Sequence, residues 1–203
     1  MKILALENSS AQGSVAWLED DCEPTVFEFP NDRKHSGAFF QSLQRFSDRF
    51  DDLNSIVVGL GPGSYAGVRI AISAAIGLRS SSGARLLGLP SICALATEAN
   101  EYCVVGDARR QSFFFARIGA NEIVEGVDLY DEAELRARLA KLDPNIPIFS
   151  SETLAQFEQA IVRYPSALVL ARLIQRGVSN PSPAPLEPIY LRAPHITIPG
   201  TGA

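Results

Sequence analysis

Short apolar runs separated by polar turns occur throughout the chain, and they predict β-strands. Some runs alternate apolar and polar residues, while others are continuously apolar and rich in Val, Ile and Leu. The first pattern is typical of a strand with one buried face, and the second of a strand buried on both faces. We expect strands at residues 2–6, 13–18, 24–29, 55–60, 85–89, 102–106, 112–118, 123–129 and 146–149.

Between these runs, the apolar spacing changes to that of α-helices. Phe39, Leu43, Phe46 and Phe50 recur at steps of four, three and four, which gives one apolar stripe along a helix. A serine before a helix and a glycine after it are typical caps, as at Ser91 and Gly177. We expect helices at residues 34–50, 67–79, 91–99, 131–141, 152–161 and 167–176.

Both halves of the chain therefore follow the order β-β-β-α-β-α, with the second half abbreviated. Three antiparallel strands followed by a helix and a parallel strand are typical of a ribonuclease-H-like half. Two such halves form an actin-like α/β fold. We expect the halves to span residues 1–100 and 101–203, the second with an extended, proline-rich C-terminal tail.

Composition and charge narrow the class of protein. The 203 residues are 46% hydrophobic and 20% charged, and no apolar run is long enough to span a bilayer. The N-terminal apolar run is too short for a signal peptide, so we expect a cytoplasmic protein. A net charge of −5 is poorly suited to nucleic acid, so any contact with RNA is expected to be indirect. Three cysteines without a C-x-x-C pair indicate neither a zinc site nor a disulfide framework.

The stretch GLGPGSYAGVRI joins a predicted strand to a predicted helix, an arrangement that often binds phosphate. It lacks the lysine of a Walker A loop. A dinucleotide fingerprint would need an acidic residue at the end of the next strand, and the first one there is Glu98. An actin-like nucleotide site would place ENSSAQGS and GDARRQS beside the phosphates, which makes Glu7, Asp107 and Arg109 nucleotide-proximal candidates. Few glycines occur in either stretch, so that site is degraded or unusual.

Residues for metal binding or nucleophilic catalysis are scarce. His35 is followed by Phe39 four residues later, so the pair of histidines that binds a metal on one helix face is absent. His195 is the other histidine, far along the sequence. Ser64 lacks the flanking glycines of a nucleophile elbow, and we expect it to cap the following helix. The sequence therefore predicts no metal and no catalytic residue.

Two predicted helices raise the question of what covers them. The helix after the glycine loop reads AGVRIAISAAIGL, in which only Arg69 and Ser73 are polar, so it is expected to be buried almost all round. The stripe from Phe39 to Phe50 is also wholly apolar. Either feature is compatible with the chain's own core or with a surface that binds another protein.

GPGSYAGVRI resembles the GPGSFTGLRIG signature of the TsaB (YeaZ) family. ILALENSS, KHSGAFFQSL, GLPSICALA, DARRQSFFFA and PIYLR are similar to further family segments, in the same order. These matches extend from residue 3 to residue 192. The chain departs from the family pattern at Glu7-Asn8, where the family has Asp-Thr, and at Tyr65-Ala66, where it has Phe-Thr.

The resemblance implies an actin-like fold and a role in making threonylcarbamoyladenosine at position 37 of tRNAs that read codons starting with A. It implies a non-catalytic subunit that binds and activates a TsaD-type transferase, is joined by a TsaE-type ATPase, and forms a homodimer when alone. It implies no cofactor of its own, apart from weak ATP or ADP binding at the shared interface. The interface residues that it implies are His35, Phe39, Leu43, Phe46, Arg69, Ile72, Ser73 and Ile76. The glycine loop would then be structural, with Gly61, Pro62, Gly63, Ser64 and Gly67 setting the turn. The alternative is a stand-alone actin-like ATPase or kinase.

Overall fold

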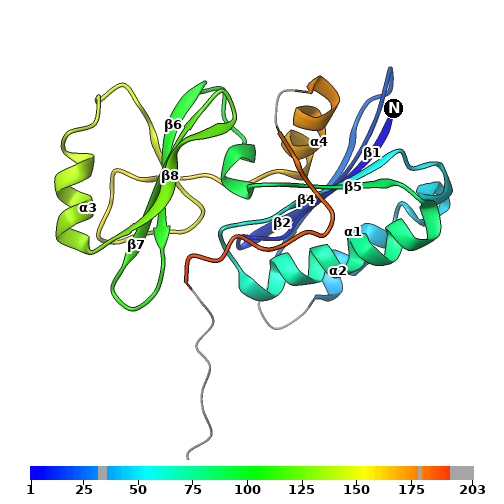
Figure 1. Cartoon of the computed structure of the whole chain (residues 1–203), viewed down its shortest axis with the longest axis horizontal. Coiled ribbons are helices and arrows are strands. Elements are labelled where there is room, and N and C mark those ends of the chain that lie inside the picture. The colour runs from blue at the N-terminus through cyan, green and yellow to red at the C-terminus, as the bar shows by residue number, and fades with distance from the viewer. Residues whose placement is uncertain (32–35, 178–179, 193–203) are drawn as a thin grey trace, which may run out of the picture.

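The computed structural model describes residues 1–31, 36–177 and 180–192, and Figure 1 shows two β-sheets side by side. The first sheet has the strand order β11-β5-β4-β1-β2-β3. Its strands are β1 (Lys2–Glu7), β2 (Gln12–Glu19), β3 (Thr25–Pro30), β4 (Ser55–Gly59), β5 (Arg85–Leu89) and β11 (Ser182–Pro183). Neighbours β1, β2 and β3 are antiparallel, whereas β4 lies parallel to both β1 and β5.

The second sheet repeats this topology. Its order is β10-β9-β6-β7-β8, and its strands are β6 (Glu101–Asp107), β7 (Phe113–Gly119), β8 (Glu122–Tyr130), β9 (Ile148–Ser150) and β10 (Ile161–Val162). Strands β6, β7 and β8 are antiparallel, and β9 is parallel to β6 and to β10. The chain is therefore an α/β protein with the actin-like arrangement of two ribonuclease-H-like halves. The first half, as the term is used from here on, includes strand β11 and the helix at residues 167–176, because both join or cover the first sheet.

Helices cover both faces of the first sheet, which explains why β1 and β4 are continuously apolar. Residues Leu4 and Leu6 of β1 face α1 (Gly37–Gln44) and α2 (Tyr65–Ser82), while Ile3 and Ala5 face α4 (Ala167–Arg176). A short 3-10 helix η1 (Ser47–Asp52) follows α1. Because successive strand residues point to opposite faces, β1 contributes to two separate cores.

The second sheet is covered by α3 (Glu132–Leu139) on one face. Its other face packs against the 3-10 helix η2 (Ser91–Ala94), which lies in the connection between the sheets. Asp131 and Glu134 form a capping box at the start of α3, and Gly177 ends α4 in the left-handed conformation. Among the described residues, no helix is long and apolar enough to cross a membrane.

Three predicted helices differ from those in the structure. The helix expected at 34–50 divides into α1 and η1 within its described part. The helix expected at 91–99 stops after η2, because Leu95 is extended and forms a β-bridge with Pro165. The helix expected at 152–161 is absent, since Phe157 turns into the second core and Ile161 begins strand β10. In the second and third cases, tertiary contacts override the local pattern.

Candidate functional site

The glycine loop turns sharply between β4 and α2, and hydrogen bonds hold its backbone. Gly61 has φ of +85°, in the left-handed region that glycine adopts readily. Its N–H donates to Oγ of Ser91 at 2.9 Å, and its carbonyl accepts from the N–H of Ser91 at 2.8 Å. Ser64 caps α2, because its Oγ accepts the N–H of Gly67 at 3.2 Å, which confirms the predicted cap. The turn is therefore fixed by contacts within the chain.

Close backbone approach explains two further glycines. A Cβ at Gly63 would overlap the carbonyl oxygen of Ser9, and a Cβ at Gly67 would overlap that of Asn8. The N–H of Ser64 also donates to the carbonyl of Ser9 at 2.6 Å. The glycines thus let the start of α2 lie directly against the loop that follows β1.

Glu7 does not join the other nucleotide-proximal candidates. Its side chain is completely buried, its Oε1 accepts the N–H of Ser9 at 2.7 Å, and its Oε2 has no hydrogen-bond partner among the described residues. Burial raises the pKa of the Glu7 carboxyl, although hydrogen bonds from Ser9 oppose that shift. The carboxyl lies against Gly59 and Ser91 rather than in an open site.

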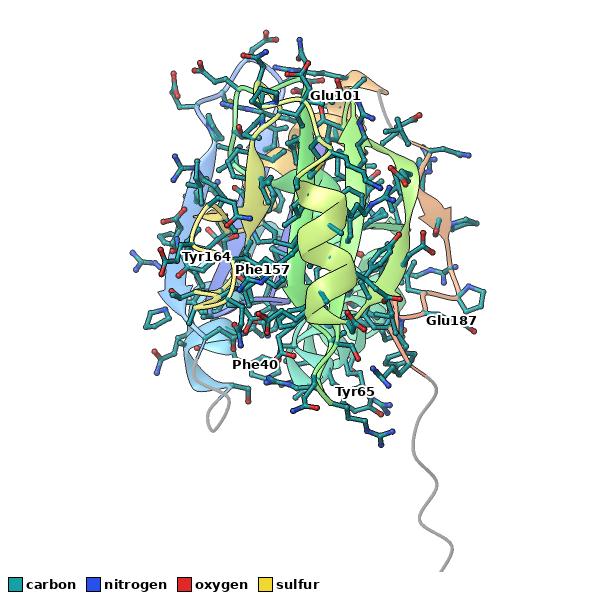
Figure 2. All side chains as sticks on the ribbon, turned by 90° about the vertical axis from the view of Figure 1, so that its left-hand side faces the viewer. Phe40, Tyr65, Glu101, Phe157, Tyr164 and Glu187 are labelled. Atoms are coloured by element: carbon teal, nitrogen blue, oxygen red, sulfur yellow. The ribbon has the colours of Figure 1, made fainter. Side chains whose placement is uncertain are left out.

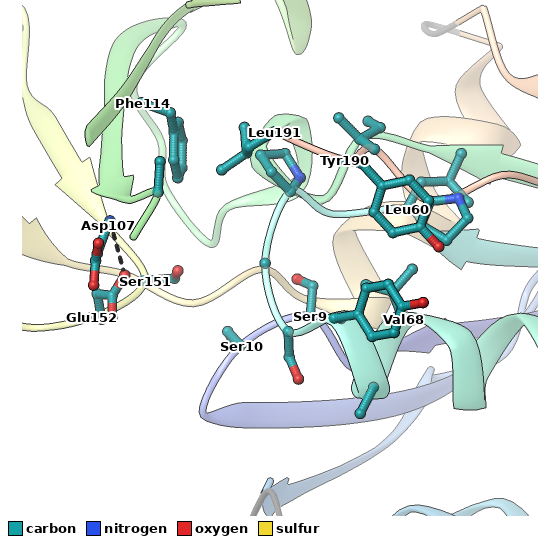
Figure 3. A pocket seen from close by; sticks show the side chains of 18 of the residues that line it. Ser9, Ser10, Leu60, Val68, Asp107, Phe114, Ser151, Glu152, Tyr190 and Leu191 are labelled. Carbon is teal, nitrogen blue, oxygen red and sulfur yellow. Dashed lines mark hydrogen bonds between the residues drawn. The ribbon is translucent and has the colours of Figure 1, made fainter. Parts of the chain in front are cut away.

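A cleft of about 610 Å³ lies between the two halves, and Figure 3 shows it. The first half contributes Ser9, Ser10 and the glycine loop from Pro62 to Ala66. Asp107 and Glu152 line it from the second half, and residues 188–192 form a further wall. The cleft therefore brings together segments that are distant in the sequence.

Asp107 and Arg109 do lie at this cleft, but they bind each other. The backbone N–H of Arg109 donates to Oδ1 of Asp107 at 2.6 Å, and its guanidinium donates to Oδ2 at 2.8 Å. Glu152 accepts the N–H of Asp107 at 3.1 Å. Arg109, Arg110 and Gln111 all have positive φ, of 65°, 54° and 58°. Bulky side chains thus occupy the turn where close approach to a phosphate would favour glycine, and both oxygens of Asp107 are already engaged.

Within residues 1–31, 36–177 and 180–192, no group of three or more His, Cys, Asp or Glu side chains could hold a metal ion. Both histidines, His35 and His195, lie outside the described residues. The expected interface position at His35 is therefore not described.

Four of the implied interface residues belong to the core of the first half. Phe39, Leu43, Phe46 and Ile72 are each at most 7% exposed. Phe46 stacks on Trp17 at a ring-centroid distance of 6.0 Å, and Phe39 meets Phe29 edge-on at 6.2 Å. In this structure the chain itself encloses these four side chains, with Trp17 of β2 against Phe46 and Phe29 of β3 against Phe39, so their contact with a partner stays a prediction.

The exposed side of the same two helices carries other residues. Phe40 of α1 is 48% exposed, while Tyr65 and Ile76 of α2 are 56% and 49% exposed. Arg69 and Ser73, also on α2, are exposed between them. One side of α2 is therefore exposed in the single chain, and its expected burial on all sides would need a partner to cover Tyr65, Arg69 and Ile76.

Sequence reasoning missed Tyr190 and Arg192. Tyr190 lies with its ring centroid 5.5 Å from that of Tyr65, and Arg69 donates to the Tyr65 hydroxyl at 2.7 Å. Arg192 donates to the carbonyl of Ala108 at 3.2 Å and to Oγ of Ser112. The segment PIYLR was the available signal, but its spacing gives no indication of which distant residues it contacts.

Comparison with known proteins gives matches over most of the chain. Residues 33–187 match the family model described as TsaD, tRNA N6-adenosine threonylcarbamoyltransferase. An uncharacterized protein of Mycobacterium tuberculosis is 30% identical over 145 residues, which are 70% of this chain and 66% of that protein. The tRNA threonylcarbamoyladenosine biosynthesis protein TsaB of Escherichia coli is 30% identical over 103 residues, or 49% of this chain and 44% of that protein.

Solved structures from Pseudomonas aeruginosa share the fold. A protein described as similar to peptidase YEAZ superposes with a TM-score of 0.74 at 21% identity, covering 94% of this chain and 99% of that one. YeaZ of the same organism gives 0.69 at 17% identity, covering 93% and 100%. At these identities, the likeness concerns the fold.

Proposed function

The chain belongs to the TsaB (YeaZ) family, and from that premise we propose that it is a non-catalytic subunit for threonylcarbamoylation of adenosine 37 in tRNAs that read codons starting with A. In this proposal it binds and activates a TsaD-type transferase subunit, which a TsaE-type ATPase joins. The tRNA is contacted mainly by the other subunits.

The observation that carries the proposal is the exposed apolar surface on α1 and α2. We call the set Phe40, Tyr65, Arg69, Ser73 and Ile76 the docking face. The side chains of Phe40, Tyr65 and Ile76 are about half exposed, and aromatic residues are enriched at the centres of protein interfaces. Figure 2 shows Phe40 and Tyr65 at the same end of the molecule. The small residues of α2 would let a helix of the partner approach its backbone closely.

A non-catalytic role is supported by how the carboxylates are used. Both oxygens of Asp107 accept hydrogen bonds from Arg109, and Glu7 is buried beneath the glycine loop. Glu7 is thus enclosed by the protein, and the charge of Asp107 is paired with that of Arg109. We accordingly propose that any ATP or ADP is held weakly, by residues shared with the partner. In the absence of the partner, the docking face is proposed to pair with a second copy of the chain.

Binding to the TsaD-type subunit of the same organism, measured by isothermal titration calorimetry, tests the proposal. Ile76→Asp should weaken binding about tenfold or more, because an unpaired charge would be buried in the interface. The matched control is Val124→Asp, since Val124 is 59% exposed on strand β8 of the other half. Equal affinities for the two variants would contradict the assigned face.

A further inference from the structure

The last described segment of the chain joins the two halves beside the cleft. Strand β11 first pairs with β5, and Leu186 is buried in the first core. The N–H of Ile189 then donates to the carbonyl of Leu60 at 2.8 Å. Figure 1 shows this segment in orange to red, passing from the first half toward the second.

Within three residues, the contacts change to the second half. Leu191 packs against the core that contains Tyr102 and Phe114. Arg192 holds the turn between β6 and β7 through the carbonyl of Ala108 and the hydroxyl of Ser112. Residues 186–192 therefore attach to one half at Leu186 and Ile189 and to the other half at Leu191 and Arg192. We call them the clasp.

The other two connections between the halves lie together at a different place. Leu95 forms a β-bridge with Pro165, and the N–H of Ser166 donates to the carbonyl of Ala94 at 2.9 Å. These two crossings pair with each other, whereas the clasp lines the cleft, as Figure 3 shows for Tyr190 and Leu191. The halves are thus joined at these paired crossings, where η2 also packs on the second sheet, and, separately, at the cleft.

We propose that the clasp limits how far the two halves separate around the cleft. We further propose that docking of the partner on α2 favours the state in which the cleft is closed. The coupling would pass through Tyr190, whose ring lies beside that of Tyr65 in the docking face at an interplanar angle of 33°, and through Arg69, which donates a hydrogen bond to the Tyr65 hydroxyl. A partner that covers Tyr65 and Arg69 has a higher affinity for the state in which Tyr190 is held beside these two residues. It therefore shifts the population toward closure. The coupling rests on the proposed function, whereas the clasp itself does not.

The contacts at the far end suit a reversible device. The hydrogen bond from Arg192 to Ser112 lies at the surface, the one to the carbonyl of Ala108 is partly buried, and the Arg192 side chain is exposed. Hydrogen bonds that compete with water contribute modestly to stability, so they can open without unfolding either core.

Spin-label distances between the halves test the clasp in the isolated protein. Labels are placed at Ser81→Cys on α2 and Ala133→Cys on α3, both exposed positions. Cys22→Ser removes the exposed thiol, while Cys93 and Cys103 are buried and burial raises the pKa of Cys93 to about 12. Arg192→Ala should broaden the distance distribution and move it to longer distances. The control Arg110→Ala removes an exposed arginine from the turn between β6 and β7 that Arg192 contacts, and it should leave the distance distribution unchanged. Identical distributions for both variants would overturn the clasp.

Adding the TsaD-type subunit tests the coupling. It should narrow the distribution of Arg192→Ala, and by reciprocity this variant should bind the subunit about fivefold or more weakly than Arg110→Ala. Unchanged affinity in a variant that has opened would overturn the coupling. If the unmodified chain does not bind the subunit at all, both the proposed function and the coupling are wrong, and the distance measurement alone decides the clasp.

Discussion

The carboxyl group of Glu7 occupies the space that a side chain at position 59 would need, because a Cβ on Gly59 would overlap Oε2 of Glu7. The two residues lie at the ends of neighbouring parallel strands, β1 and β4. Glycine at position 59 thus allows an acidic side chain to be buried completely beneath the loop. This relationship removes Glu7 from the cleft and ties its protonation to folding.

The stability of the protein should therefore fall as pH rises through the pKa of buried Glu7. The folded state holds the proton more tightly than the unfolded state, because burial raises the pKa of the Glu7 carboxyl above the ordinary glutamate value of 4.5. The stabilising contribution is complete below the unfolded pKa and is lost above the folded one. Glu7→Gln should flatten the dependence of the unfolding free energy on pH, measured by urea denaturation from pH 4.5 to 8.5. Parallel curves for variant and unmodified protein would show that Glu7 is already ionised in the folded state.

Gly63→Ala should destabilise the protein by about 1–3 kcal/mol, because the new Cβ would meet the backbone carbonyl of Ser9. Gly77→Ala is the matched control, since nothing lies within 4 Å of its added Cβ. In the exposed middle of α2 this change should stabilise by up to about 1 kcal/mol. Urea denaturation measures both, and a Gly63→Ala variant as stable as Gly77→Ala would refute the close approach of loop and helix.

Alanine substitutions at Phe40 of α1 and at Phe46, just after α1, should have very different effects on stability. Phe46→Ala should lower the unfolding free energy by about 3–5 kcal/mol, because Phe46 is 1% exposed and packs on Trp17 and Phe27. Phe40→Ala should change it by about 0.5 kcal/mol or less, since the ring is half exposed. Thermal or urea unfolding distinguishes the two variants. Similar losses of unfolding free energy would contradict the assignment of Phe46 to the core and Phe40 to the surface.

The isolated chain should show no saturable binding of ATP with Mg²⁺ in calorimetry at micromolar protein. The reason is that Arg109 engages both oxygens of Asp107, and its turn lacks the glycines that let a backbone approach phosphate. Tight binding that is lost in Arg109→Ala would instead favour the stand-alone ATPase or kinase.

Sequence patterns were sufficient for much of the fold because strand and helix periods are local. The strands at 2–6, 55–60 and 102–106 and the helix at 167–176 lie where their apolar spacing predicts. The helix expected at 152–161 does not form. Leu154 and Phe157 enter the core of the second half, and Ile161 begins strand β10, which pairs with β9.

The candidate site was harder to predict for the same physical reason. Periodicity identifies the apolar face of α1 but not the aromatic residues of β2 and β3 that cover Phe39 and Phe46. The acidic character of Glu7 suggested an open site, whereas its burial depends on Gly59, far away in the sequence. Tyr190 and Arg192 act through contacts with residues about 80 to 125 positions earlier, which no local pattern encodes.

A reconstituted modification assay tests the central proposal most directly. It combines tRNA with the TsaD- and TsaE-type proteins of the same organism and with the TsaC-type synthase that supplies threonylcarbamoyl-adenylate in this family's pathway. The reaction is run with and without this chain, and threonylcarbamoyladenosine is measured by mass spectrometry of the digested tRNA. We expect modified adenosine when the chain with its own sequence or the Val124→Asp variant is present. When the chain is omitted or replaced by Ile76→Asp, we expect at most a trace of modified adenosine. Equal modification without the chain would contradict a role as a required partner subunit.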